Sequence, residues 1–402
     1  MRFVVLGDLH LDSRDTESFD RAREQILRLA PEAIVCLGDL GSGPASGTRG
    51  SFEAAREYLA SFDVPCFSIL GNHDLERLDL FATDAEAVRS FCEAFESEQP
   101  YRSIELGAFM GVLLSSTGFR DNRGYSHEVS IDDEQFDWFR RTLEANALRP
   151  TVVFSHAPPL GSHLRVLQYP HLRAGNAWLN QSNRPQRFMD LLAQHPQVRL
   201  WFSGHNHLGQ QYPDSTTLVG RCLFAHTGVI GESTRDGRHH SRLVCSDDAS
   251  DRGEACLRID TFDHATDCVV SDVRFDLRAN RIERVTPEPS EPGDPFFAPR
   301  PFAEIERTAG ELVLGRSLFC AYRDMLVEYD VDLGDPVGVV EDWLGSTRVS
   351  IEEESVVLRR WAGRRRIQPN PDGYYFQIPA RNRRLVNALR EAVLRRIQIK
   401  AN

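Results

Sequence analysis

The stretch Gly71-Asn72-His73-Asp74 directly follows the apolar run Val64-Pro65-Cys66-Phe67-Ser68-Ile69-Leu70, which is typical of a short buried strand. Glycine permits a sharp turn, and the next three side chains present an amide oxygen, an imidazole and a carboxylate at the strand tip. Ordinary turn chemistry explains the same four residues, because Asn and Asp after Gly are common turn formers. The stretch gains meaning because similar strand ends recur along the chain.

Strand-like apolar runs alternate with amphipathic helical stretches over the first half of the sequence. The runs are residues 2–6, 33–37, 64–70, 151–154 and 198–202. The helical stretches are residues 17–29, 52–62, 85–95, 133–148, where Asp132 is the expected N-cap, and 184–194. This alternation predicts an α/β architecture. After residue 210 the pattern favours strands, at 217–219, 221–225, 255–262 and 268–275, and residues 231–251 are expected to form a long mobile loop.

The sequence predicts three regions. Six prolines between residues 286 and 301 indicate a linker or a wrapping extension. We therefore expect a catalytic domain at residues 1–285, a Pro-rich linker at 286–301 and a smaller α+β domain at 302–402. Within that last domain we expect helices at residues 318–330 and 381–399.

Charge is distributed unevenly along the chain of 402 residues, whose net charge is −12. Residues 355–402 contain eleven Arg and one Lys against two acids, a net of +10, so the preceding residues carry −22. Arginines beside Trp361 and Tyr374-Tyr375-Phe376 could bind nucleic acid through phosphate contacts and stacking. Docking on an acidic surface, or formation of a homo-oligomer, explains the same pattern and is the preferred interpretation.

The composition and the N-terminal sequence argue against a secreted or membrane-spanning protein. A chain that is 41% hydrophobic and 26% charged resembles ordinary globular proteins. We find neither a signal-peptide pattern at Met1 nor a run of about 18–20 apolar residues, so we expect a cytoplasmic protein with no membrane partner.

Five strand ends carry side chains that bind metals. They are Asp8-x-His10, Gly38-Asp39, Gly71-Asn72-His73-Asp74, His156 and Gly204-His205-x-His207. A single member means little, since a lone histidine such as His156 is usually structural. Together they matter, because ligands gather at the carboxyl ends of strands in α/β sheets. Carboxylate, imidazole and amide ligands suit Mn, Fe, Zn or Co.

This series of motifs resembles the calcineurin-like metallophosphoesterase superfamily over roughly residues 1–280. The resemblance implies a four-layer α/β/β/α sandwich with two divalent metal ions at the strand ends. It implies that one ion is held by Asp8, His10, Asp39 and His207. It implies that the second ion is held by Asp39, which bridges, and by Asn72, His156 and His205. A hydroxide between the ions would attack phosphorus, His73 would act on the phosphate or leaving group, and Asp74 would orient His73.

The pattern is most similar to the class III cyclic-nucleotide phosphodiesterase branch. The similar segments are Gly118-Phe119-Arg120, Ser126-His127-Glu128 and His156-Ala157-Pro158-Pro159. The second motif departs from the commonest form, because Leu40-Gly41-Ser42 follows Asp39 without a second acid. The resemblance therefore implies a phosphoester substrate but does not identify it.

We predict a phosphodiesterase acting on a small nucleotide or similar diester. A phosphomonoesterase, a nuclease that uses the basic C-terminal domain, and a scaffold with a vestigial metal site are the alternatives. The candidate substrate contacts are Asn72, His73, His163 and Asn176, together with His171, Asn180 and Asn183 in the same polar loop. Exposure to solvent explains the loop residues equally well.

Overall fold

The computed structural model describes residues 1–12, 16–77, 79–119, 128–166, 176–181, 184, 186–235, 237–247 and 256–285, and the backbone of eight strands between residues 311 and 377. The chain divides into two compact units, Met1–Ala298 and Pro299–Asn402. All of the strand-end motifs lie in the first unit. The predicted linker at residues 286–301 lies outside the described residues.

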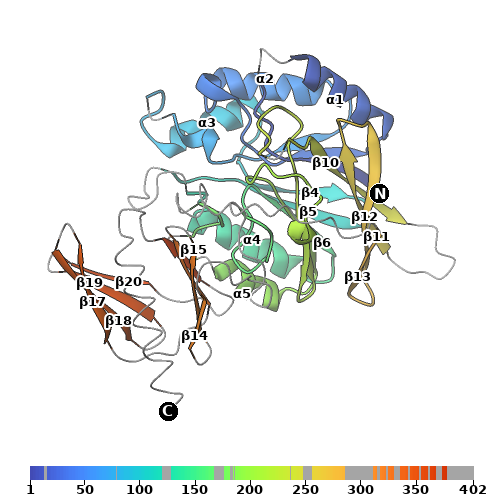
Figure 1. Ribbon diagram of the computed structural model, residues 1–402. Coiled ribbons are helices and arrows are strands. Elements are labelled where there is room, and N and C mark those ends of the chain that lie inside the picture. Colours follow the sequence, from blue (N-terminus) through green and yellow to red (C-terminus); the bar gives the residue numbers. More distant parts are fainter. Residues whose placement is uncertain are drawn as a thin grey trace. The chain divides into compact units, whose positions relative to one another are not determined.

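Two β-sheets pack face to face in the first unit (Figure 1). One sheet has the strand order β13-β12-β11-β10-β1-β2-β3 and the other the order β4-β5-β6-β7-β9-β8. The strands of the first sheet are β1 (Arg2–Leu6), β2 (Ala33–Cys36), β3 (Cys66–Ser68), β10 (His240–Asp247), β11 (Cys256–Asp263), β12 (Cys268–Asp276) and β13 (Arg281–Arg284). Those of the second are β4 (Arg102–Leu106), β5 (Phe109–Leu114), β6 (Thr151–Ser155), β7 (Val198–Ser203), β8 (Thr216–Val219) and β9 (Cys222–His226).

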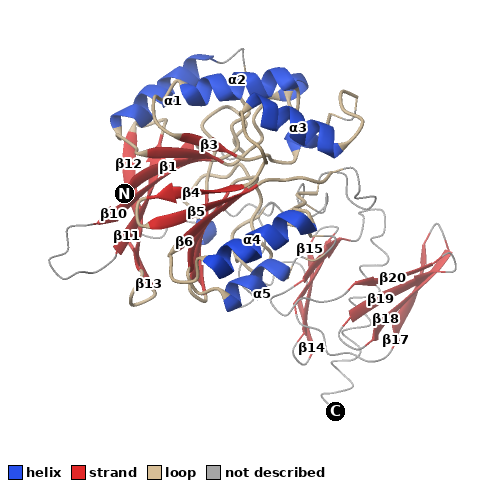
Figure 2. Cartoon of the chain, turned by 180° about the vertical axis from the view of Figure 1, so that it is seen from behind, coloured by secondary structure: helices blue, strands red, loops and turns tan. Residues whose placement is uncertain are grey.

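Helices cover the outer face of each sheet, as Figure 2 shows from behind. The helices over the first sheet are α1 (Thr16–Arg28), α2 (Arg49–Ala60) and α3 (Asp84–Ala94). Those over the second are α4 (Asp133–Ala145), which the Asp132 side chain caps as predicted by accepting from Gln135 N at 2.7 Å, and α5 (Arg187–Gln194). The predicted four-layer α/β/β/α sandwich is confirmed.

Three apolar clusters fill the three spaces between the four layers. Side chains alternate along a strand, so Phe3 and Val5 of β1 enter the cluster between the sheets, whereas Val4 and Leu6 enter the cluster beneath the helices. Because β1, β2 and β3 are parallel, as are β5, β6, β7 and β9, their carboxyl ends can supply side chains to a common site.

One strand of the first sheet contradicts the prediction. Residues 231–251 were expected to be a loop, but they contain β10, which pairs with β1. Arg242 lies in the middle of β10 and is 0% exposed. Its guanidinium is compensated by Asp272 and by the carbonyl of His226, at 2.9 Å from Nε. A charged residue with buried partners hides the apolar pattern by which a central strand is recognised.

The described parts of the second unit are strands in two four-stranded sheets. One sheet contains β14 (Glu311–Leu314), β15 (Ser317–Tyr322), β16 (Met325–Tyr329) and β21 (Tyr374–Gln377). The other contains β17 (Pro336–Asp342), β18 (Gly345–Glu352), β19 (Ser355–Arg360) and β20 (Gly363–Ile367). The helix predicted at residues 318–330 is therefore wrong, because β15 and β16 form a hairpin there. The helix predicted at 381–399, on which the α+β assignment also depends, lies outside the described residues.

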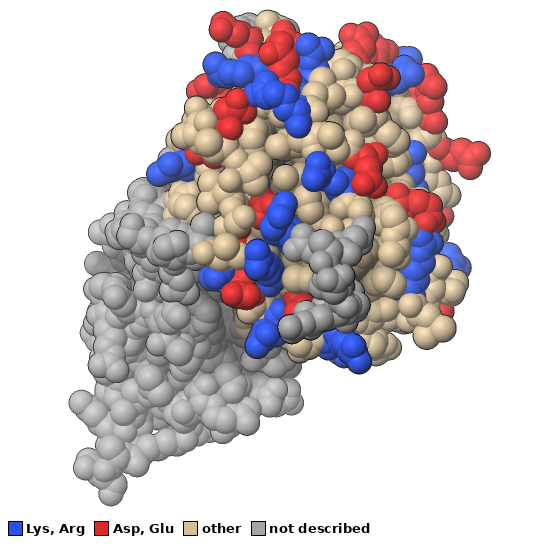
Figure 3. Space-filling model, turned by 90° about the vertical axis from the view of Figure 1, so that its right-hand side faces the viewer, with Lys and Arg blue, Asp and Glu red and all other residues tan. Residues whose placement is uncertain are grey.

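Within the described residues, no helix is both long enough and apolar enough to cross a membrane. On the face of the first unit seen in Figure 3, acidic and basic side chains are intermingled.

Candidate metal centre

Four strands from the two sheets deliver charged side chains to one place. The first group of potential metal ligands is Asp8, His10, Asp39 and His207, and the second is Asp39, His156 and His205. Within each group the potential ligand atoms all lie within 4.8 Å of one another. These residues follow β1, β2, β6 and β7. Asp39 belongs to both groups, so the structure places two adjoining ligand sets around one carboxylate.

Four of these residues adopt a backbone conformation that side chains normally avoid. The φ angles of His10, Asp39, His205 and His207 are 41°, 48°, 68° and 51°. Left-handed non-glycine residues cost on the order of 1–3 kcal/mol each and cluster at functional sites. The strand ends therefore turn in a strained manner that brings these side chains together.

Two glycines make room for the carboxylates. A Cβ at Gly71 would lie 2.1 Å from Asp39 Oδ1, and a Cβ at Gly204 would lie 2.2 Å from Asp8 Oδ1. The glycines of the Gly71-Asn72-His73-Asp74 and Gly204-His205-x-His207 motifs are thus required by close approach as well as by the turn.

Backbone groups orient both carboxylates. Asp8 Oδ1 accepts from His205 N at 2.6 Å, and Asp39 Oδ1 accepts from His73 N at 2.9 Å. Among the described residues, none donates a hydrogen bond of good geometry to the buried Oδ2 atom of either aspartate. These Oδ2 atoms lie near imidazole nitrogens, with Asp8 Oδ2 at 2.6 Å from His207 Nε2 and Asp39 Oδ2 at 3.2 Å from His156 Nε2. A cation would satisfy both oxygens.

Backbone carbonyls fix the tautomer of three histidines. The Nδ1 atom lies 3.2 Å from Gly41 O in His10, 2.8 Å from Leu37 O in His156 and 2.8 Å from Ser233 O in His207. A carbonyl can only accept, so each Nδ1 carries hydrogen and each neutral ring offers an Nε2 lone pair to the site. The Nε2 atoms of His10 and His207 face each other at 3.1 Å. Two lone pairs at this distance repel unless positive charge lies between or beside them.

Polar atoms that favour a nearby positive charge also surround the Nε2 atom of His156. Its Nε2 lies 3.1 Å from Asn72 Oδ1, 3.2 Å from Asp39 Oδ2 and 3.1 Å from His205 Nδ1. Burial lowers the pKa of His156, but Asp39 and Asp8 outweigh burial and raise it to about 10. For His10, burial and the neighbouring His207 lower the pKa to about 4. The donor set therefore fits metal cations, which accept neutral imidazole and carboxylate ligands together.

Asn72 lies beside the second group and His73 beside the first. The ring centroids of His10 and His73 are 5.6 Å apart. The predicted contact between Asp74 and His73 is wrong, because the buried Asp74 carboxylate accepts from Leu40 N at 2.9 Å and from Gly71 N at 2.8 Å. Burial and Asp39 raise the pKa of Asp74 to about 7. Asp74 thus holds two loops together beneath the site instead of contacting the imidazole.

Glu76, which was not among the predicted site residues, takes the position that was expected of Asp74. Its Oε2 lies 2.7 Å from His73 Nδ1, and its Oε1 accepts from Asn72 Nδ2 at 2.9 Å. The spacing could have indicated it, since residues three and four apart share one face of a helical turn.

Three of the five loop residues predicted to contact substrate lie among the described residues, and their environments differ. His163 is exposed, whereas Asn176 is 4% exposed and its Oδ1 has no partner among the described residues. Neither makes a hydrogen bond to the two ligand groups in the described part of the chain, so their contact with substrate stays a prediction. His171 and Asn183 lie outside the described residues. The Asn180 side chain holds a neighbouring loop, because its Nδ2 donates to the backbone carbonyl of Ile131 at 2.9 Å.

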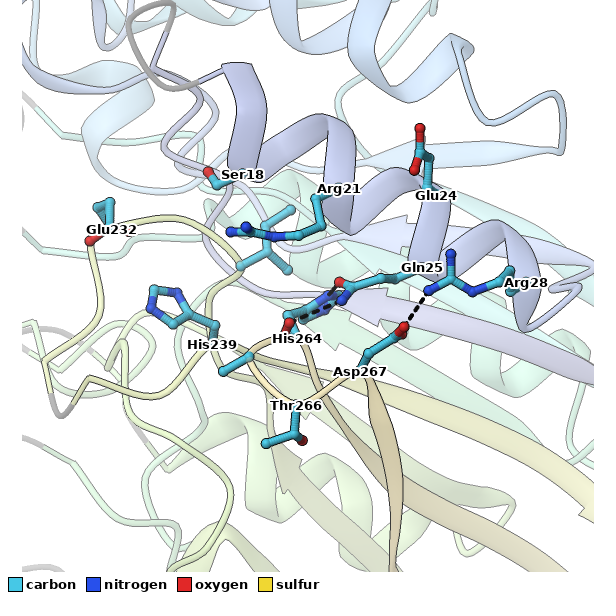
Figure 4. A pocket seen from close by; sticks show the side chains of 12 residues that line it. Ser18, Arg21, Glu24, Gln25, Arg28, Glu232, His239, His264, Thr266 and Asp267 are labelled. Atoms are coloured by element: carbon cyan, nitrogen blue, oxygen red, sulfur yellow. Dashed lines mark hydrogen bonds and ion pairs between the residues drawn. The ribbon is translucent and has the colours of Figure 1, made fainter.

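A polar pocket of about 560 Å³ lies between α1 and the turn that joins β11 to β12 (Figure 4). Gln25 and His264 hydrogen-bond to each other in its wall, and Arg28 pairs with Asp267. Glu232 also lines the pocket and precedes Ser233, whose carbonyl orients His207.

The chain is similar to several known proteins. A 3′,5′-cyclic-nucleotide phosphodiesterase from Nostoc is 26% identical over 197 residues, which are 48% of this chain and 62% of that protein. The glycerophosphodiester phosphodiesterase GpdQ of Enterobacter lignolyticus is 27% identical over 184 residues, 45% of this chain and 58% of that protein. Among solved structures, the purple acid phosphatase PPD1 of yellow lupin aligns with 73% of this chain and 57% of that chain, with 14% identity and a TM-score of 0.48.

The chain spans about three fifths of the length of the curated relatives it matches. The family model for calcineurin-like phosphoesterases matches residues 1–209, more than half of the sequence. That range contains every residue of the two ligand groups. The chain belongs to the calcineurin-like phosphoesterase family.

Proposed function

We propose that the chain is a phosphodiesterase that uses two divalent metal ions to hydrolyse a small nucleotide or a similar diester. The observation that carries this proposal is the pair of adjoining ligand groups that share Asp39. We assign the first ion to Asp8, His10, Asp39 and His207. We assign the second ion to Asp39, Asn72, His156 and His205. When bound, such a pair supplies charge neutralisation for the phosphate and an activated water as nucleophile.

The residues of the chain then divide the remaining work. The backbone N–H of His73 holds one oxygen of Asp39, which leaves the other oxygen for the shared position. His73 lies at the edge of the centre, and its side chain is 40% exposed, so a substrate can reach it from solvent. Because Nδ1 of His73 donates to Glu76, the Nε2–H of the protonated ring is the group that can donate to a phosphate oxygen or to the leaving oxygen.

The relatives favour a diester over a monoester. Both sequence relatives described above carry names of phosphodiesterases, one for cyclic nucleotides and one for glycerophosphodiesters. In both substrate classes, phosphorus is linked to two carbon-bearing oxygens, and the leaving group is an alcohol of high pKa. A proton donor placed as His73 is has most effect on such a leaving group.

The test is an assay of metal-stripped protein reloaded with Mn²⁺, Zn²⁺ or Co²⁺. We expect metal-dependent hydrolysis of bis(p-nitrophenyl) phosphate and of cyclic nucleotides that exceeds hydrolysis of p-nitrophenyl phosphate. Asp39→Asn should lower the rate by more than about a hundredfold, because losing even an outer partner of a metal ligand costs about 10–100-fold. Asp190→Asn alters an exposed carboxylate on α5 and serves as the matched control. Absence of metal-dependent turnover in the parent protein would refute the proposal.

A further inference from the structure

We propose that Glu76 is a positioning residue that sets both the amide orientation of Asn72 and the tautomer of His73. Its consequence for catalysis rests on the function proposed above, whereas its consequence for metal binding does not. The residue lies outside the two ligand groups and belongs to none of the strand-end motifs.

The local backbone brings the three side chains together. A short 3-10 helix, His73–Leu75, follows Asn72, and Glu76 ends it with helical φ and ψ of −78° and −7°. Residues three and four apart in a helical turn project from the same face, so Glu76 meets both His73 and Asn72. The Glu76 side chain is 20% exposed, which limits the competition of water for its oxygens.

The first carboxylate oxygen decides which end of the Asn72 amide faces the site. Asn72 Nδ2 donates to Glu76 Oε1 at 2.9 Å, and Oδ1 consequently points to His156 Nε2 at 3.1 Å. The two ends of an amide have nearly the same shape, so hydrogen bonds alone choose between them. Without Glu76 the amide could rotate and present hydrogens to the second ligand group, where only an oxygen can bind a cation.

The second carboxylate oxygen decides which nitrogen of His73 faces the substrate. Glu76 Oε2 accepts from Nδ1 at 2.7 Å, which assigns the hydrogen of that nitrogen and leaves Nε2 for the reaction. The other acid in this turn, Asp74, points instead to the backbone, where its oxygens accept from Leu40 N and Gly71 N. One carboxylate therefore orients two neighbouring side chains with different tasks.

Replacement of Glu76 by glutamine or by alanine tests these contacts. Both contacts require an acceptor, and a glutamine side chain offers one accepting and one donating group. Glu76→Gln can thus keep the amide orientation of Asn72 or the Nδ1–H tautomer of His73, but not both, while its shape is nearly unchanged. Glu76→Ala removes both contacts. Glu53→Gln provides the matched control, because Glu53 is an exposed carboxylate on α2 that pairs with Arg49.

The first measurement is calorimetric titration of metal-free protein with Mn²⁺. We expect the parent and Glu53→Gln to bind two ions and Glu76→Ala to bind the second about 10–100-fold more weakly, with the first unchanged. Thermal unfolding of the metal-free variants establishes that they fold. Equal affinities in the parent and both Glu76 variants would overturn the role at Asn72.

The second measurement compares kcat for two phosphodiesters that share one ester group. They differ in the leaving group, which is p-nitrophenol in one and an alkanol in the other. We expect Glu76→Ala to slow the alkanol ester at least about tenfold more than the nitrophenyl ester, because only the poorer leaving group needs a proton. An equal loss for both esters indicates a structural role and overturns the role at His73. If the parent hydrolyses neither diester, the proposed function fails, and the Mn²⁺ titration alone decides on Glu76.

Discussion

His264 provides a test of the fold through its response to acid. The residue follows β11 and is 6% exposed in the wall of the pocket drawn in Figure 4. Its Nδ1 lies 3.0 Å from Gln25 Oε1, and its Nε2 lies 3.0 Å from Ser241 Oγ. Burial and the neighbouring His240 lower the pKa of this ring to about 3. The folded protein therefore holds a neutral histidine that the unfolded chain would protonate.

The sign and size of the effect follow from proton linkage. An unfolded histidine titrates near its ordinary pKa of about 6.5, so below that pH the unfolded state binds a proton that the native state refuses. The stability that depends on neutral His264 is complete above about pH 6.5 and is lost progressively as the pH falls toward 3. At pH 5 the loss of stability amounts to about 2 kcal/mol, since each pH unit below the unfolded-state pKa of about 6.5 is worth about 1.4 kcal/mol.

Urea unfolding of the parent and of His264→Asn, both in chelator, measures this loss. Asparagine retains a donor toward Gln25 but does not titrate. The variant should be less stable at pH 7.5 by a constant amount, and between pH 7.5 and 5 the parent should lose about 2 kcal/mol more than the variant. The other histidines titrate in both proteins and cancel in the comparison. Parallel pH profiles would refute the reasoning, because they would mean that His264 is protonated equally in both states.

Two further substitutions test the frame of the site by thermal and urea unfolding. Gly71→Ala should destabilise the metal-free protein by about 1–3 kcal/mol, because its Cβ would lie 2.1 Å from Asp39 Oδ1. Gly50→Ala is the control: it lies in the open first turn of α2 and should stabilise the protein by about 0.5–1 kcal/mol. Equal changes in the free energy of unfolding for the two glycine variants would contradict the close approach of Gly71 to Asp39. Trp201→Phe should cost about 1–3 kcal/mol, because the buried indole N–H donates to Ser155 Oγ at 2.7 Å beside the His156 strand end. An unchanged urea midpoint would show that this hydrogen bond contributes nothing.

The strand-end residues could be predicted because their positions depend on regular elements. Each motif follows an apolar run directly, and parallel strands bring their carboxyl ends to one edge. The contacts within the turn after Gly71 could not be predicted in the same way. Whether His73 meets Asp74 or Glu76 depends on the 3-10 conformation of only three residues, and the sequence spacing permits either contact.

The two errors in secondary structure have separate physical causes. β10 was missed because Arg242 and its buried partners occupy the centre of a strand that pattern reading expects to be apolar. The sequence of the β15–β16 hairpin predicts a helix because its short apolar runs of six and five residues fit the periods of both helix and strand. The polar pair Arg323-Asp324 between those runs was the signal for a turn.

The candidate ligands are aimed by the backbone before any cation arrives. Asp8 and Asp39 are fixed through Oδ1 by N–H groups, and His10, His156 and His207 are fixed through Nδ1 by carbonyls. Altering one of these arrangements requires moving a strand end whose conformation is already strained. Asn72 and His73 differ, because a side chain orients them. Under the function proposed above, a single substitution at Glu76 would therefore change the affinity for the second ion and the proton donor while the backbone that holds the other ligands stays in place.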